Sequence, residues 1–91
     1  MIKSLVKALL FSFALLSNAQ QKASIDSLNK LPFATKIENA AHLDDDFLKN
    51  AEDAHKLKYI LGEAESYSNL SLVYYFQGKY EKDLQYALKA I

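Results

Sequence analysis

Few side chains in this 91-residue sequence have the chemistry of a reactive or metal-binding site. His42 lies two residues before the acidic run Asp44–Asp46, and an imidazole beside carboxylates could hold a metal ion. The run lacks the alternating acidic spacing and the glycine of a calcium-binding loop, and the two histidines do not stand at zinc-binding spacing. With no cysteine in the chain, thiolate metal sites, disulfides and cysteine nucleophiles are excluded. We therefore interpret His42 and the acidic run as solvent-exposed groups and predict no metal.

The remaining candidates for catalysis are one histidine and three serines. His55 stands beside an apolar helical stripe and is interpreted as a boundary residue, not as a base or a ligand. Ser66, Ser68 and Ser71 fall in a helical pattern with no histidine and acid placed to activate a hydroxyl. The sequence therefore predicts no catalytic residue, no enzymatic activity and no cofactor.

Composition and charge narrow the class of protein further. The chain is 51% hydrophobic and 24% charged, which is typical of globular proteins and excludes a disordered or low-complexity chain. Its 11 basic residues, all lysine, balance 11 acidic residues. The chain therefore has no net positive charge that would attract nucleic acid. Because the chain has no arginine, it also lacks the planar guanidinium group that usually recognises phosphate or carboxylate through two hydrogen bonds.

Residues 1–19 have the three-part order of a secretory signal peptide. Lys3 and Lys7 form a basic start, Ala8–Leu16 is apolar apart from one serine, and Ser17–Ala19 supplies small residues for cleavage. The alternative is an uncleaved membrane anchor, but the apolar stretch is shorter than the roughly 18–20 residues that span a bilayer. We expect cleavage after Ala19 and a mature chain that starts at Gln20 with a formal charge of −2. The expected location is the periplasm, with secretion from the cell as the alternative. Without a cysteine after the apolar stretch, a lipoprotein anchor is excluded.

The mature chain is predicted to be all-α. Residues 20–43 form an irregular helical lead-in, in which Pro32 should end one element or open the next. Asp44–Asp46 is predicted to start the next helix, because carboxylates suit the positive end of a helix dipole. Apolar residues then recur at helical spacing from Phe47 to Leu61, and Gly62 is expected at the helix end or in the turn after it.

Two further helices are predicted in residues 64–91, separated by the turn Gln77–Lys79. The first is apolar on more than one face, which is typical of a helix that lies between neighbours or lines a groove. The second has a single apolar stripe, made of Tyr80, Leu84, Ala87, Leu88 and Ile91. No alternating run typical of a β-strand occurs anywhere in the chain.

Residues 64–91 resemble a tetratricopeptide repeat, a pair of antiparallel helices in which small residues allow close approach and aromatic residues fill the space beside them. The resemblance implies an α-solenoid built from such pairs. The positions that carry it are Tyr67, Leu70, Ser71, Tyr74, Gly78, Tyr80, Ala87 and Ala90.

Residues 44–63 resemble the second helix and linker of a degenerate first repeat. Ala51 and Ala54 stand 36 residues before Ala87 and Ala90, close to the usual repeat length of about 34. The first helix of that earlier repeat would lie in residues 24–43, where the consensus is weak.

Two features depart from the family pattern. Asp83 stands where the family usually has alanine at the closest helix contact, and an unpaired buried charge there would splay or rotate the helix pair. The sequence also ends at Ile91, inside the second helix of the repeat.

The resemblance also implies a binding surface. Stacked repeats curve so that their first helices line a concave groove, and the residues that would point into it are Glu65, Ser68, Leu72, Tyr75 and Phe76. The same residues could instead cover a following repeat. The aromatic cluster of Tyr67, Tyr74, Tyr75, Phe76, Tyr80 and Tyr86 is interpreted mainly as the interior of the repeat, with a ligand cage as the alternative.

The expected function is therefore protein–protein or peptide binding by an exported helical-repeat module, with membrane contact only through the signal peptide or a downstream segment. The resemblance extends to the N-terminal periplasmic repeats of Bacteroidetes-type sensor and regulator proteins. The alternative is accordingly a truncated N-terminal sensor region of a membrane histidine kinase. Coding sequence downstream of Ile91 would separate these two functions.

Overall fold

The computed structural model describes residues 18–91, and every regular element in this range is an α-helix. The predicted all-α class is confirmed for this part of the chain, while nearly all of the predicted signal peptide lies outside the described residues. The helices are an N-terminal segment of residues 18–29, α2 (Phe33–Glu38), α3 (Ala40–Lys56), α4 (Ile60–Phe76) and α5 (Tyr80–Ala90). Within residues 18–91, none of them has the length and apolar composition needed to cross a membrane.

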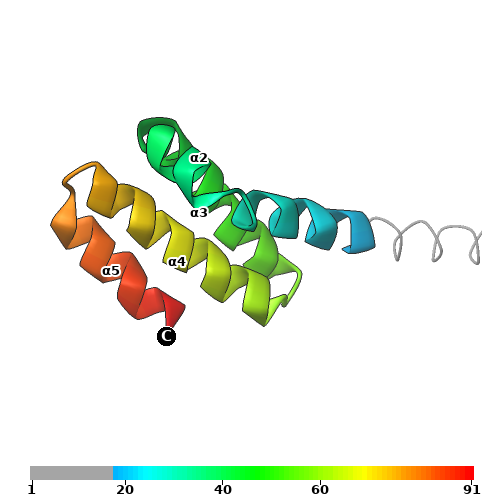
Figure 1. Cartoon of the computed structure of the whole chain (residues 1–91). Helices are drawn as coiled ribbons and strands as arrows, with labels where there is room; N and C mark the ends of the chain where they lie inside the picture. Colours follow the sequence, from blue (N-terminus) through cyan, green and yellow to red (C-terminus); the bar gives the residue numbers. More distant parts are fainter. Residues whose placement is uncertain (1–17) are drawn as a thin grey trace, which may run out of the picture.

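Three antiparallel helices, α3, α4 and α5, lie side by side with α4 in the middle (Figure 1). The N-terminal segment crosses near the start of α4, and the short α2 connects it to α3. The described chain is thus a layer of adjacent packed helices, which is compatible with a helical repeat.

The interior lies between α3 and α4. Phe47, Leu70 and Val73 have no exposed surface, and full burial of each such side chain stabilises a fold by about 1.5–3 kcal/mol. Ala51 and Ala54 of α3 are also fully buried. Because these two side chains are small, α4 can approach the C-terminal half of α3 closely.

The turn between α3 and α4 lies earlier than the sequence predicts. Gly62 was expected at a helix end or turn, but α3 ends at Lys56, Lys58 adopts the left-handed backbone with φ 57°, and Gly62 is buried inside α4. A Cβ at residue 62 would lie 2.5 Å from the Tyr59 ring and 3.1 Å from the Ile25 side chain. The glycine therefore serves close packing, and the turn conformation is adopted by a lysine.

The acidic run does not start α3. The helix begins at Ala40, so Asp44–Asp46 lies in its second turn, where the dipole acts only weakly. Asn39 precedes the helix, and its amide donates to the Thr35 carbonyl oxygen at 2.9 Å instead of capping α3. The prediction of a helix start at the acidic run was wrong because the chain already turns at Asn39.

Pro32 acts as the sequence predicts. The N-terminal segment ends at residue 29, and Pro32 stands directly before the first residue of α2. Residues 24–43 are consequently not one continuous helix but parts of three. If an earlier repeat has a first helix here, only the N-terminal segment is long enough to supply it.

Candidate interaction surfaces

The five residues predicted to line a concave face differ widely in exposure. Glu65 and Leu72 are partly buried, and Ser68 is exposed. Tyr75 and Phe76, at the C-terminal end of α4, are 52% and 44% exposed. The aromatic pair therefore offers most of the apolar surface in this set.

Tyr75 and Phe76 belong to a larger aromatic patch, defined here as Phe33, Tyr75, Phe76 and Tyr80. The Phe33 and Phe76 rings meet edge to face with centroids 6.1 Å apart, and Tyr75 contacts Phe76 at 5.2 Å and Tyr80 at 5.7 Å. Phe33 and Tyr80 are 60% and 63% exposed. Helices α2, α4 and α5 thus each contribute to one continuous exposed aromatic surface.

The other three aromatic residues of the predicted cluster form the interior of the α4–α5 pair. Tyr86 of α5 stacks on Tyr67 at 5.9 Å and on Tyr74 at 5.6 Å, and Tyr74 is only 7% exposed. The Lys89 ammonium lies 5.1 Å from the centre of the Tyr86 ring, a cation–π contact. The cluster therefore divides into a half that packs between α4 and α5 and a half that is exposed.

The other residues on which the resemblance to a repeat rests are mostly buried or partly buried. Leu70 and Ser71 are buried, and Ala87 and Ala90 are partly buried. Gly78 has φ 76°, the left-handed conformation that the turn between α4 and α5 requires.

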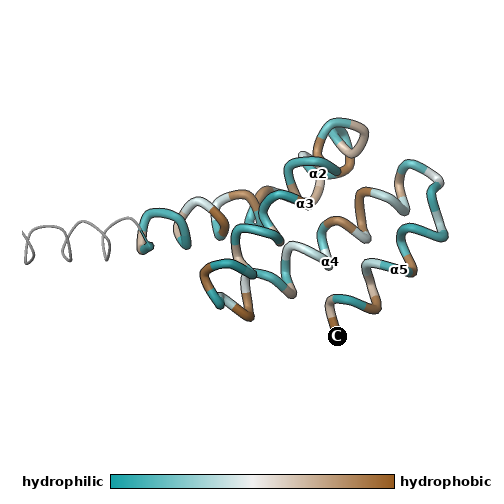
Figure 2. Tube along the Cα trace, turned by 180° about the vertical axis from the view of Figure 1, so that it is seen from behind, coloured by the Kyte–Doolittle hydropathy of each residue, from teal (hydrophilic) through white to brown (hydrophobic). Residues whose placement is uncertain are grey.

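The single apolar stripe predicted for α5 is split in the structure. Its side toward α4 is formed by partly buried residues, namely Asp83, Tyr86, Ala87 and Ala90. We define the α5 stripe as Leu84, Leu88 and Ile91, which are 63%, 63% and 100% exposed. Hydrophobic residues are visible along α5 and at its C-terminal end in Figure 2.

Asp83 is paired, so its departure from the family pattern is compensated locally. The Ser71 hydroxyl of α4 donates a hydrogen bond to its Oδ1. Both residues stand at positions where the family has small side chains, and the hydrogen bond lets a serine and an aspartate occupy this contact together.

A buried polar cluster joins the N-terminal segment to α3 and α4. Ser66 has no exposed surface; its hydroxyl donates to the Gly62 carbonyl oxygen at 2.7 Å and accepts from the Asn29 and Asn50 amides at 3.1 and 3.0 Å. The Asn69 amide donates to Asn29 Oδ1 at 3.0 Å. Among the described residues no buried side-chain polar atom lacks a partner, so the cluster is fully satisfied.

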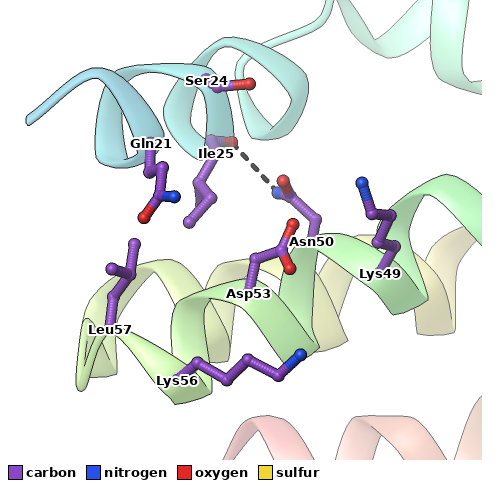
Figure 3. A pocket seen from close by; sticks show the side chains of 8 residues that line it. All are labelled: Gln21, Ser24, Ile25, Lys49, Asn50, Asp53, Lys56 and Leu57. Atoms are coloured by element: carbon purple, nitrogen blue, oxygen red, sulfur yellow. Dashed lines mark hydrogen bonds between the residues drawn. The ribbon is translucent and has the colours of Figure 1, made fainter. Parts of the chain in front are cut away.

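A pocket of about 310 Å³ lies beside this cluster, between the N-terminal segment and α3 (Figure 3). In the wall of the pocket, the Asn50 amide donates a hydrogen bond to the Ile25 carbonyl oxygen at 3.1 Å. The side chains that line the pocket are mixed in charge: Gln21, Ser24, Ile25, Lys49, Asn50, Asp53, Lys56 and Leu57.

His42 and His55 are both exposed, and the three candidate serines differ in burial. His55 is exposed at the end of α3, and its Nδ1 lies 3.1 Å from a Glu63 carboxylate oxygen, a surface contact of small energetic value. Ser68 is exposed, whereas Ser66 and Ser71 make the structural hydrogen bonds described above. No group of three or more possible metal-ligating side chains gathers within residues 18–91.

Three tyrosines have raised pKa values. Burial raises the pKa of Tyr67 and of Tyr74, because an ionised phenolate would lose hydration. The pKa of Tyr59 is raised mainly because its hydroxyl donates to Asp26 Oδ1 at 2.6 Å. Burial lowers the pKa of Lys36, and the nearby Glu65 acts in the opposite direction.

Sequence reasoning missed Phe33 as part of an exposed surface, and Asn29 and Asn50 as parts of a buried one. The only available signal was the position of both asparagines among residues of helical stripes, where a polar side chain needs a partner. Comparison of the chain with family models, curated proteins and solved structures gives no match.

Proposed function

We propose that this chain is an exported helical-repeat protein of the tetratricopeptide type that binds another protein through the aromatic patch. The observation that carries the proposal is the mutual contact of four aromatic side chains that remain 44–63% exposed. Isolated exposed apolar residues are common on soluble proteins, but a contiguous patch from three helices is typical of an interaction site.

The chemistry of the patch favours a polypeptide partner. Tyrosine and phenylalanine bring large, rigid contact areas with little conformational entropy to lose, and aromatic residues are enriched at protein interfaces. The Tyr75 and Tyr80 hydroxyls add hydrogen-bonding groups beside the apolar rings. The patch is therefore suited to an extended or helical peptide that inserts apolar side chains between the rings.

The tetratricopeptide assignment is supported by where the motif residues lie. Leu70 and Tyr74 are in the interior, Tyr67 stacks on Tyr86 across the α4–α5 pair, and Gly78 has the required left-handed backbone. Ser71 and Asp83 replace the small residues of the closest contact as a hydrogen-bonded pair.

Site-specific cross-linking tests the binding site. A photoreactive amino acid in place of Phe76 should give a discrete cross-linked partner in cells. The matched control is the same group at Glu52, an exposed residue on the half of α3 far from the patch. Equal cross-linking at both positions, or none at Phe76, would contradict the proposal.

Affinity measurements with the identified partner then separate the patch from the predicted concave face. Tyr75→Ala and Phe76→Ala should each weaken binding about tenfold or more, as expected for aromatic contacts at the centre of an interface. The affinity of Ser68→Ala tests the part of the predicted concave face that lies on α4 outside the aromatic patch. An unchanged affinity for both aromatic variants would overturn the patch as the binding site.

Export has its own test. Intact-mass analysis of the protein recovered from the cell envelope should give a chain that begins at Gln20. A recovered protein that retains Met1 would reject cleavage after Ala19 and favour an anchored form.

A further inference from the structure

The pocket between the N-terminal segment and α3 continues into a second hollow. This hollow has a volume of about 290 Å³ and adds Leu28 and Asp46 to the lining. The two hollows share four lining residues, namely Ser24, Lys49, Asn50 and Asp53. Together they form one continuous groove along α3, which we call the α3 groove.

Asn50 supplies a hydrogen-bond acceptor to the α3 groove, although its side chain is only 7% exposed. Its Nδ2 donates to the Ile25 carbonyl oxygen and to the Ser66 hydroxyl, and these two acceptors fix the orientation of the amide. Its Oδ1 accepts no hydrogen bond within residues 18–91. Since no fully buried side-chain polar atom in this range lacks a partner, Oδ1 reaches solvent through the groove. A donor bound there would give this oxygen its missing partner.

Three charged side chains of α3 stand around Asn50. Asp53 is partly buried, and Lys49 and Lys56 lie four residues before it and three residues after it, on the same face of the helix (Figure 3). Within residues 18–91 the only ion pair joins His55 and Glu63, so none of these three charges is neutralised by a neighbour. The carboxylate and Asn50 Oδ1 together suit an ammonium group, and a lysine on either side suits a carboxylate next to it.

The end of the α3 groove nearest the turn between α3 and α4 is apolar. The side chains of Ile25 and Leu57 project into the space between the two helices (Figure 3), and Ile25 is only 2% exposed. The first hollow, about 310 Å³, has the size of a site for a small ligand, since such sites measure roughly 300–1,000 Å³. The groove therefore offers an apolar wall beside a few charged and polar groups.

We propose that the α3 groove binds a free aliphatic α-amino acid such as leucine. Asn50 Oδ1 and the Asp53 carboxylate accept from its ammonium group, one of the two lysines donates to its carboxylate, and its side chain packs on the apolar end. This inference goes beyond the proposed function and does not depend on it. The groove lies on the C-terminal half of α3, whereas the aromatic patch lies at the opposite end of the helical layer (Figure 1).

Isothermal titration calorimetry of the purified protein, with its N-terminus as processed by the host cell, tests the proposal. Leucine should bind at one site with a dissociation constant on the order of 100 µM, as expected for a small ligand in an open groove. Glycine should bind about tenfold more weakly or less, because it leaves the apolar end uncovered. N-acetyl-leucine should not bind, because it has no ammonium group.

The variant Asp53→Asn should weaken leucine binding about tenfold or more, because the ammonium group loses a charged acceptor. The Asp53 carboxylate makes no hydrogen bond within residues 18–91, so circular dichroism should show unchanged helicity. The matched control is Asp45→Asn, which removes the same charge from an exposed residue of α3 outside the groove and should leave leucine binding unchanged.

Three results would overturn the proposal: no saturable binding of leucine up to about 10 mM, unchanged affinity in Asp53→Asn, or equal binding of N-acetyl-leucine. The dipeptide leucylglycine carries the same ammonium group and side chain at the N-terminus of a peptide. If it binds as tightly as leucine, the free amino acid is overturned as the ligand in favour of a peptide N-terminus.

Discussion

The hydroxyl of Ser66 joins three helical elements at one buried atom. It receives amide hydrogens from Asn29 and Asn50 and donates its own to the Gly62 carbonyl oxygen. The N-terminal segment contributes few apolar side chains to the interior, with Ile25 as its one buried hydrophobic residue. Hydrogen bonds therefore fix the position of this segment, because any shift would leave buried amides unpaired.

Replacement of Ser66 by alanine should lower the free energy of unfolding by about 1–3 kcal/mol, because two buried asparagine amides lose an acceptor. Ser68→Ala on the same helix is the control. Its exposed hydroxyl should matter little, with a change within about 0.5 kcal/mol. Urea denaturation of both variants checks the prediction, and equal stabilities would show that the polar cluster contributes nothing.

Gly62 is required for its lack of a side chain. In Gly62→Ala the new Cβ would lie 2.5 Å from the Tyr59 ring, and the hydrogen bond from the Tyr59 hydroxyl to Asp26 limits how far this ring can move. Alanine normally stabilises a helix by about 1 kcal/mol relative to glycine. Here we expect a loss of about 1–3 kcal/mol from overpacking. A raised thermal midpoint in this variant would contradict the close-packing role.

At the scale of elements, the α4–α5 pair combines an apolar interior with one polar contact. Leu70 and Tyr74 are buried, while the Ser71–Asp83 hydrogen bond joins the two helices. A charged side chain is tolerated between two helices here because it has a donor on the opposite helix and remains partly solvated.

A double-mutant cycle isolates this contact. Asp83→Ala and Ser71→Ala should each destabilise the chain by about 1 kcal/mol, and the double variant should lose less than the sum of the two. Denaturant unfolding of the four proteins gives the coupling energy. A coupling close to zero would mean that the two side chains do not support the helix pair.

For the whole molecule, stability should fall at alkaline pH. In the unfolded chain the tyrosine pKa is 10.0, whereas Tyr59, Tyr67 and Tyr74 have raised pKa values when folded. Above the unfolded pKa the unfolded state binds fewer protons than the folded state, so the free energy of unfolding decreases as pH rises. The lowered pKa of Lys36 has the opposite effect on the free energy of unfolding. Since it is one group and the tyrosines are three, we expect the tyrosines to determine the direction of the change.

Thermal unfolding at about pH 8 and about pH 11, on either side of the unfolded tyrosine pKa, checks this expectation. The wild-type midpoint should drop between the two. Tyr59→Phe should drop less, because one of the three raised groups is removed. A midpoint that rises with pH would contradict the role of these three tyrosines.

Several structural features could be predicted from particular residues. Pro32 marks a helix boundary, and the Leu70–Tyr74 spacing identifies the interior face of α4, because both signals are local to one helix. Gly62 and Asp44–Asp46 misled the prediction of boundaries. A glycine that avoids a clash and a glycine that forms a turn have the same letter, and Gly62 packs against Ile25, a residue far away in the sequence.

The sequence by itself determined the helical class, the interior positions of Leu70 and Tyr74 in α4 and the lack of cysteine chemistry. These follow from residue type and from spacing within a helix, which chain geometry alone dictates. Only the tertiary structure decided that Ser66, Asn29 and Asn50 meet, that the aromatic cluster divides between the α4–α5 contact and the exposed surface, and that Leu84 and Leu88 of α5 are exposed within residues 18–91. Each of these depends on which helices come to lie side by side, and contacts between residues distant in sequence leave no periodic signal along the chain.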